Sequence, residues 1–200
     1  VSDHLTWLAE VILEQVMNLA WYPMINKYGT PSTLQDEQSK GFCIIGYGKL
    51  GGLELGYGSD LDMVFIHNQD INQNTTGDSD GNRSISIAQF YIRYAQKVMQ
   101  LISTRTHSGI LYEVDMRLRP SGNSGLIVSS INGFDEYQQK DAWTWEHQAL
   151  VRCRPVAGDH DLAEHIQTVR KAILSLKRDK KDLLTEVDSM RKKMRTHLAK

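Results

Sequence analysis

Two aspartates separated by a single residue, Asp60 and Asp62, are the side chains of this sequence best placed for chemistry. They stand at the start of an apolar run that favours a strand, and alternate residues of a strand point to the same face. Two carboxylates held side by side repel each other, and a hard divalent cation offsets that repulsion. An Asp-x-Asp pattern is common by chance, but the glycine-rich segment before this one and the apolar run after it favour a magnesium site.

Asp115 is the expected third carboxylate of this site. Residues 110–119 alternate polar and apolar side chains as a strand does, which places Asp115 on one face with Arg117 and Arg119. A third carboxylate on a neighbouring strand lets two metal ions lie roughly 3.5–4 Å apart for phosphoryl or nucleotidyl transfer. The two arginines either contact phosphate oxygens or pair with Glu113 and nearby acids, and the sequence leaves both interpretations open.

Other phosphate-binding and metal-binding motifs are excluded by their context. Residues 46–51 match the dinucleotide-binding pattern GxGxxG, but more glycines and a second strand follow where that motif needs a full helix. Lys49 is not in a Walker A loop, because no Ser or Thr follows it and the glycine spacing differs. A metal-dependent phosphoesterase would need histidines near the acids, and His67 alone, at the far end of its strand, does not supply them.

The composition is typical of a soluble globular protein, with 40% hydrophobic and 24% charged residues in a chain of 200. A net charge of −1 gives no electrostatic reason to expect nucleic acid or an anionic membrane as a partner. No apolar run approaches the length of a membrane span. The chain has two cysteines, and Cys43 lies in an apolar run, so we expect a buried free thiol and a reducing compartment.

The first elements along the chain are a helix and two strands. Helical spacing predicts a helix over residues 3–21, with Pro23 just past its end. Apolar runs at 42–45 and 61–66 predict strands, and the polar segment 68–82 predicts a surface loop. The side chains expected to form the buried stripe of the first helix are Leu5, Leu8, Ile12, Val16 and Leu19.

Helices dominate the second half of the prediction. Helical periodicity returns from Ile87 to Leu101, and residues 126–128 are expected to pair back against the strand at 110–119 as a hairpin. Helices follow from residue 132, the last of them over about 180–198. This order predicts an α+β fold, a small mixed sheet with flanking helices and a C-terminal helical extension.

Three motifs together resemble a known family. The segments are GYGKLGGLELGYGSDLD at 46–62, STRTHSGILYEVDMRLRPSG at 103–122 and AWTWEHQALVRCRPVAGD at 142–159. The first resembles the DNA polymerase β-type nucleotidyltransferase superfamily, and all three resemble the bacterial glutamine synthetase adenylyltransferase. The resemblance implies a nucleotidyltransferase core with its N-terminal helix at 1–155, and the start of a helical extension at 156–200.

The resemblance also implies roles for individual residues. Asp60 and Asp62 match the family's metal-binding pair, and Asp115 matches its third carboxylate. Gly48 and Lys49 fall at the distance before Asp60 where the superfamily has its nucleotide-binding turn, although Lys49 replaces the usual small residue. Nucleotide contacts are thus expected from Gly48, Lys49, Ser59, Arg117 and Arg119.

The activity implied is magnesium-dependent transfer of AMP from ATP to a tyrosine of glutamine synthetase in the cytoplasm, with the signalling protein PII as a further partner. That enzyme carries two related domains, and residues 103–106 and 143–147 are more similar to the adenylylating copy than to the copy that removes AMP by phosphorolysis. Two alternatives stay open, removal of AMP and a non-catalytic module that binds PII or glutamine synthetase. The chain opens at Val1 and lacks the family's further helices, so we expect a piece of a longer polypeptide.

Overall fold

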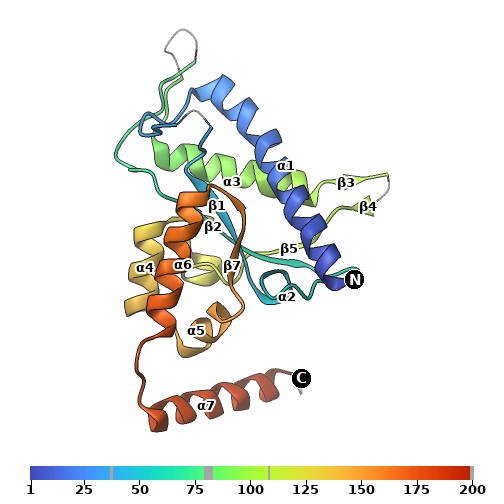
Figure 1. The fold of residues 1–200 in the computed structure, drawn as a ribbon, viewed down its shortest axis with the longest axis vertical. Coiled ribbons are helices and arrows are strands. Elements are labelled where there is room, and N and C mark those ends of the chain that lie inside the picture. The colour runs from blue at the N-terminus through green and yellow to red at the C-terminus, as the bar shows by residue number, and fades with distance from the viewer. Residues whose placement is uncertain (37, 79–82, 108, 199–200) are drawn as a thin grey trace.

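Two strands form the centre of the molecule, as the sequence predicted: β1 (Phe42–Gly46) and β2 (Leu61–His67) (Figure 1). The computed structural model describes residues 1–36, 38–78, 83–107 and 109–198. β1 runs antiparallel to β2 in a mixed sheet of order β5-β2-β1-β7, and β6 pairs with β2 as well, so the predicted α+β fold is confirmed. The other strands are β5 (Val114–Asp115), β6 (Val128–Ser130) and β7 (Arg154–Gly158), with β3 (Arg105–Thr106) and β4 (Gly109–Ile110) in a separate two-stranded sheet.

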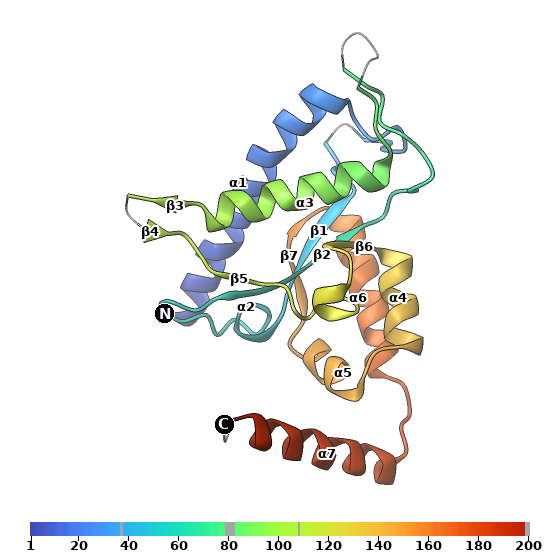
Figure 2. The same ribbon diagram turned by 180° about the vertical axis from the view of Figure 1, so that it is seen from behind.

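Helices cover both faces of this sheet, so its central strands are buried on both sides (Figures 1 and 2). Phe42 and Ile44 of β1 pack in one half of the core, and Cys43 and Ile45 pack in the other half. Burial on both sides explains why β1 is apolar throughout, and it makes Cys43 the buried free thiol that the sequence predicted. The first face carries α1 (Ser2–Tyr28) and α3 (Ile87–Ser103), and the second carries α4 (Ile131–Lys140), α5 (Thr144–Leu150) and α6 (His160–Leu174).

The first helix differs from the prediction in its end and in its buried face. α1 continues to Tyr28 with Pro23 inside it, and Pro23 lies on the exposed side, where the carbonyl left without a partner can face water. Leu8 and Leu19 of the expected stripe are exposed, whereas Leu13 is fully buried. Because apolar residues lie on every side of α1, helical period alone does not identify the buried face, and packing against α3 and the sheet decides it.

The alternating segment 110–119 does not form one strand, and its expected hairpin is absent. Only Val114 and Asp115 pair with β2, in parallel, at Leu61 and Asp62. β6 pairs with the far end of the same edge of β2 instead of with 110–119. One edge of β2 is thus shared by two short strands, and the chain between them turns away through a short 3-10 helix (Gly122–Ser124).

β7 forms in a part of the chain where the sequence predicted only helices. Pro155 cannot donate a hydrogen bond to a strand ladder, which disfavours it in a central strand. β7 tolerates it because β7 is the outermost strand beside β1, and the register shifts between Ile44 and Ile45 next to it. β7 runs across residue 155, and the division of the chain into 1–155 and 156–200 stays a prediction.

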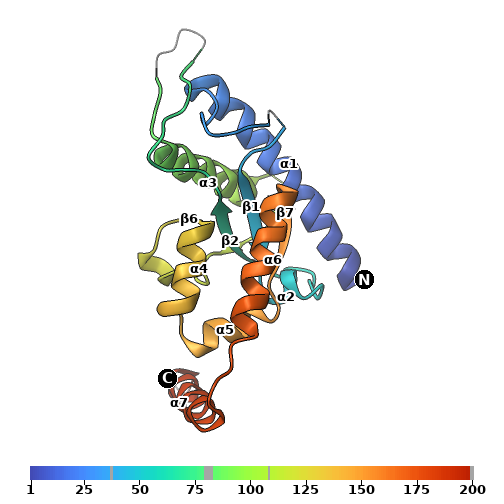
Figure 3. The same cartoon turned by 60° about the vertical axis from the view of Figure 1, so that its left-hand side comes forward.

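The last helix, α7 (Lys180–Leu198), forms where the sequence predicted it, beyond α5 and away from the sheet (Figures 1 and 3). Thr144 at the start of α5 donates a hydrogen bond to Glu186 of α7. Within the described ranges, no helix has both the length and the apolar character to cross a membrane. Part of the predicted loop at 68–82, residues 79–82, lies outside the described residues.

The buried face of α1 can be tested with two leucine substitutions. Leu13→Ala should lower the free energy of unfolding by about 2–5 kcal/mol, because it leaves a cavity between α1 and the sheet. Leu19→Ala, at a side chain 64% exposed, should change it by less than about 0.5 kcal/mol. Urea denaturation measures both, and equal losses would contradict the packing described here.

Candidate functional site

Three aspartates come together at the start of β2. Asp62 is the second residue of β2, and Asp115 stands in register beside it on the parallel strand β5, while Asp60 immediately precedes β2. One carboxylate oxygen from each of the three lies within 4.8 Å of the other two. The expected convergence is therefore confirmed. Hard oxygen donors at this spacing suit Mg²⁺, so the donor set fits the predicted metal, whose binding stays a prediction.

The turn between β1 and β2 approaches this cluster closely at Gly48. Gly48 has φ of +52°, a left-handed conformation, and begins the four-residue helix α2 (Gly48–Gly51). A Cβ at this position would lie 2.4 Å from Oδ2 of Asp62. Just before it, the backbone N–H of Tyr47 donates to the carbonyl of Asp62 at 2.9 Å. The glycine thus lets the turn lie directly against a metal-binding candidate.

Lys49 and Ser59, two predicted nucleotide contacts, lie next to each other. Nζ of Lys49 is 3.5 Å from Oγ of Ser59, and the same hydroxyl accepts a hydrogen bond from the backbone N–H of Gly56 at 3.1 Å. The positive charge of Lys49 also opposes the rise in the pKa of Asp62. The structure therefore brings Gly48, Lys49 and Ser59 close to the aspartate cluster, and their contact with a nucleotide stays a prediction.

Arg117 binds Asp115, the carboxylate that β5 brings to the cluster. Nε of Arg117 lies 3.0 Å and 2.8 Å from the two carboxylate oxygens of Asp115, and a terminal guanidinium nitrogen also pairs with Oδ2. The backbone N–H of Arg117 donates to Oδ1 at 2.8 Å. The side-chain hydrogen bonds from Arg117 hold the pKa of Asp115 below its usual value, against the effect of partial burial. Arg117 thus keeps Asp115 ionised.

Asp62 experiences the opposite shift. Its pKa is raised first by partial burial and then by the negative charges of Asp60 and Asp115. Lys49 and Arg117 lower it, but they do not cancel the rise. A divalent cation among the three carboxylates would relieve this repulsion, which is a further reason why the cluster suits a metal.

Arg119, the other arginine expected to contact phosphate, folds the loop that follows β5. Its guanidinium donates to the carbonyls of Met116 at 2.9 Å, Asn123 at 3.2 Å and Gly125 at 3.4 Å. It also lines an open depression of about 460 Å³, together with Asp60, Asp115 and Arg117. A phosphate contact by Arg119 would therefore have to share donors with these carbonyls, and it stays a prediction.

Two charged residues that the sequence analysis did not single out support the α2 turn. Arg154 of β7 donates to the carbonyls of Leu50 and Gly51, and its guanidinium also pairs with Glu10 of α1. Glu10 and Arg154 are 144 residues apart, so no local pattern announces the pair. The available signal was the position of Arg154 inside the third motif, at residues 142–159.

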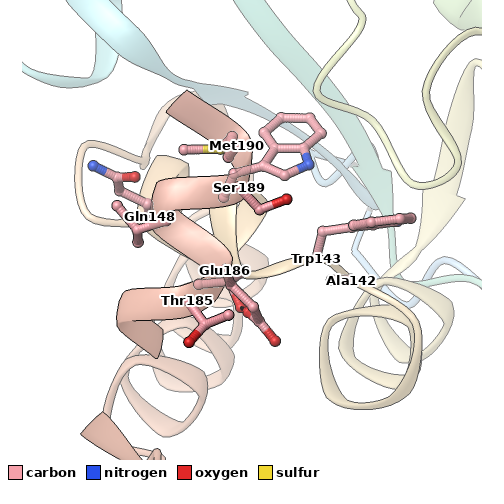
Figure 4. Close-up of a pocket in the computed structure, with 10 residues that line it drawn as sticks. Ala142, Trp143, Gln148, Thr185, Glu186, Ser189 and Met190 are labelled. Carbon is pink, nitrogen blue, oxygen red and sulfur yellow. Dashed lines mark hydrogen bonds between the residues drawn. The ribbon is translucent and has the colours of Figure 1, made fainter. Parts of the chain in front are cut away.

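A second depression, of about 490 Å³, lies between α5 and α7 (Figure 4). Trp143 and Trp145 line it from the side of α5, and Glu186 and Met190 line it from α7. Trp143 is 65% exposed. None of the aspartates of the cluster lines this groove, so it is separate from the candidate metal site.

A family model described as glutamate-ammonia ligase adenylyltransferase (GlnE) matches residues 1–169. The chain belongs to this family. The match confirms the resemblance inferred from the three motifs, and it includes the whole aspartate cluster, the α2 turn and the arginines of the site. Membership of the GlnE family implies adenylylation or deadenylylation of glutamine synthetase, with glutamine synthetase as the target protein.

The electrostatic strain at Asp62 predicts the pH dependence of an Asp62→Asn variant. In EDTA at neutral pH the variant should melt about 2–4 °C higher, because the folded parent holds a carboxylate whose ionised form is disfavoured. A raised pKa destabilises the parent fully above the raised value, partly between the raised and the ordinary value, and not at all below the ordinary value. The difference should therefore shrink as the pH falls through the raised pKa, and vanish below the ordinary value of 3.8.

Calorimetry across the pH range measures this effect. Excess Mg²⁺ should reverse the order, because the cation stabilises the parent more strongly. A variant that melts lower than the parent in EDTA at neutral pH would show that repulsion does not dominate at Asp62.

Two glycine substitutions separate backbone strain from collision with the cluster. Gly48 and Gly58 both have positive φ, so Ala at either position should cost about 1–2 kcal/mol of stability. A Cβ at Gly58 meets nothing within 4 Å, whereas one at Gly48 collides with Asp62. Mn²⁺ binding, followed by electron paramagnetic resonance, should weaken in Gly48→Ala and not in Gly58→Ala. Equal binding in both variants would show that the close approach at Gly48 does not matter for the metal.

Proposed function

We propose that this chain transfers AMP from ATP to a tyrosine hydroxyl of glutamine synthetase, with Mg²⁺ held by Asp60, Asp62 and Asp115. One observation carries the proposal: the three carboxylates converge within 4.8 Å, beside the glycine turn, in a member of the GlnE family. The rivals that lack catalysis do not require such a cluster, because three like charges held together are costly without a cation.

Different side chains around the cluster contact different parts of the nucleotide in this proposal. Gly48, Lys49 and Ser59 form the side that receives the triphosphate, where Lys49 supplies a positive charge and Ser59 a hydroxyl. Arg117 binds Asp115 of the cluster, and its fixed charge suits phosphate oxygens once it shares Asp115 with a cation. Lys49, Ser59 and Arg117 near the carboxylates support this assignment of the phosphate contacts.

The chemistry is an in-line displacement at the α-phosphorus of ATP. The tyrosine oxygen forms a new bond to that phosphorus, and pyrophosphate leaves with the electron pair of the broken bond to its bridging oxygen. The phenol proton passes to bulk water. Mg²⁺, when bound, lowers the pKa of the attacking hydroxyl and neutralises charge on the leaving pyrophosphate. Lys49 and Arg117 stabilise the remaining charge on the phosphate oxygens by electrostatic interaction.

The direction of transfer is argued from the segments around the metal site. The adenylylating and the deadenylylating copies of the family carry equivalent carboxylates. Selectivity must therefore come from residues that position a tyrosine or a phosphate ion. Residues 103–106 and 143–147 are more similar to the adenylylating copy of the family. The first of these segments ends α3 and enters β3, which leads through β4 to Asp115, where an attacking group can be guided. We therefore favour AMP addition.

Loss of the metal ligands provides the first test. Asp60→Asn and Asp62→Asn should each lower metal-dependent transfer of AMP by at least about 100-fold, since an amide is a poor ligand for Mg²⁺ and even supporting residues of metal sites cost 10–100-fold. Asp161→Asn is the matched control, because it removes one fully exposed carboxylate of α6. Full activity in either site variant would remove that aspartate from the mechanism.

The direction and the target are tested with two labelled substrates. The chain should incorporate label from α-labelled ATP into unmodified glutamine synthetase, and it should release little ADP from adenylylated glutamine synthetase and phosphate. Rapid ADP release without incorporation would reverse the proposed direction while leaving the metal site intact. Neither reaction, together with binding of glutamine synthetase or of PII, would instead support a non-catalytic module.

A further inference from the structure

We propose that Arg154 is a positioning residue for the nucleotide: it fixes α2 so that Gly48 and Lys49 keep their places beside the carboxylates. The inference rests on the proposed nucleotide site and names a residue that acts on it through the α2 turn. Arg154 belongs to β7, on the opposite edge of the sheet from β5 and Asp115. It therefore acts on the site through α2 and not by touching the nucleotide.

The guanidinium of Arg154 holds the C-terminal end of α2. Nε donates to the carbonyl of Gly51 at 3.0 Å, and a terminal nitrogen donates to the carbonyl of Leu50 at 3.2 Å. Carbonyls at the end of a helix have no partner within the helix, so a side-chain donor satisfies them. α2 has only four residues, and these bonds give it an anchor that its own backbone does not supply.

The same guanidinium is also bound by a side chain of α1. Glu10 pairs with Arg154, and both side chains are only about one quarter exposed, at 24% and 25%. One turn earlier, Thr6 accepts a hydrogen bond from the backbone N–H of Leu55, in the segment that follows α2. Figures 1 and 2 show the N-terminal half of α1 beside α2. Thus α1 and β7 together form the support on which the glycine turn rests.

The turn leaves little room for α2 to shift against this support. A Cβ on Gly51 would lie 1.9 Å from the carbonyl oxygen of Arg152, so the backbones of α2 and the chain entering β7 touch. At the other end of α2, Gly48 touches Asp62. A short helix fixed at both ends places Lys49 rigidly, and rigid placement preserves nucleotide affinity because less conformational freedom is lost on binding.

Arg152 provides a matched control on the same segment. Its side chain is 46% exposed and pairs with Glu54, whose side chain is 63% exposed, and such exposed pairs contribute little to stability. Lysine at position 154 keeps the charge that Glu10 requires, but a single ammonium does not reproduce the fork of the guanidinium across two carbonyls. Arg154→Lys and Arg152→Lys therefore change the same chemistry, but only the first alters hydrogen bonds to the carbonyls of α2, whereas the second alters an exposed pair with the side chain of Glu54.

The test combines nucleotide affinity, metal affinity and hydrogen exchange. In Arg154→Lys, the Kd of α,β-methylene-ATP with Mg²⁺ and the KM for ATP should rise about tenfold, as expected for a lost hydrogen bond from a charged donor. The value of kcat should stay within about twofold. Mn²⁺ affinity should be unchanged, because Arg154 forms no hydrogen bond or ion pair with Asp60, Asp62 or Asp115. Amide exchange at Gly51, Gly52 and Glu54 should accelerate, while Arg152→Lys should behave as the parent.

Several outcomes would overturn the proposal. Unchanged nucleotide affinity, or unchanged exchange at the α2 amides, would show that Arg154 does not position the turn. Loss of kcat and of Mn²⁺ affinity together with a lower melting temperature would indicate a merely structural role. A parent protein that binds no nucleotide would overturn the proposed function and the nucleotide role of Arg154 with it, and the exchange data would then report separately whether Arg154 holds α2.

Discussion

The structure depends on keeping three negative charges within a few ångströms of one another. Asp60, Asp62 and Asp115 would separate if their backbone were free to move, since like charges at this distance repel and partial burial weakens the screening by water. Two of them are fixed by β2 and the residue before it, and the third by its register on β5. The elements around β2 can be understood as the means by which the fold holds these positions.

The positive charges around the cluster are distributed unequally, and the pKa values of Asp62 and Asp115 therefore shift in opposite directions. Asp115 is bound by Arg117, and its pKa falls, whereas partial burial and the charges of Asp60 and Asp115 raise the pKa of Asp62. Arg117 thus offsets one of the three charges, and Lys49 reduces the effect at Asp62 without removing it. The remaining strain is concentrated at Asp62, the carboxylate against which Gly48 packs. A cation would interact most favourably there.

The sheet supplies the rigidity that this arrangement needs. β2 is buried on both faces, and its outer edge is divided between β5, which carries Asp115, and β6. Between these strands the chain makes a loop folded by Arg119, which donates to three of its carbonyls. The GlnE family match, over residues 1–169, includes all of these elements and the α5 side of the groove between α5 and α7, and it ends before α7.

Local patterns in the sequence were enough for the parts of the fold and site that are close in the chain. The central strands, the helix at Ile87–Ser103 and the Asp60–Asp62 pair all follow from runs of side chains whose spacing matches one element. Family motifs, and not geometry, brought Gly48, Lys49 and Ser59 into the prediction. In the folded chain Lys49 and Ser59 lie next to each other, and their contact with a nucleotide stays a prediction.

Tertiary structure alone decided the features that depend on which surfaces meet. The buried face of α1 was predicted only in part: Val16 of the expected stripe is buried, whereas Leu8 and Leu19 are exposed. Apolar residues lie on every side of that helix, and only its packing partners choose between faces. Alternation at 110–119 indicated a long strand, yet β2 has a single free edge and β6 occupies half of it. The pair between Glu10 and Arg154 joins residues 144 apart, and no local pattern encodes a contact at that separation. The sequence by itself therefore determined the family and the acidic residues, and the folded chain determined what surrounds and supports them.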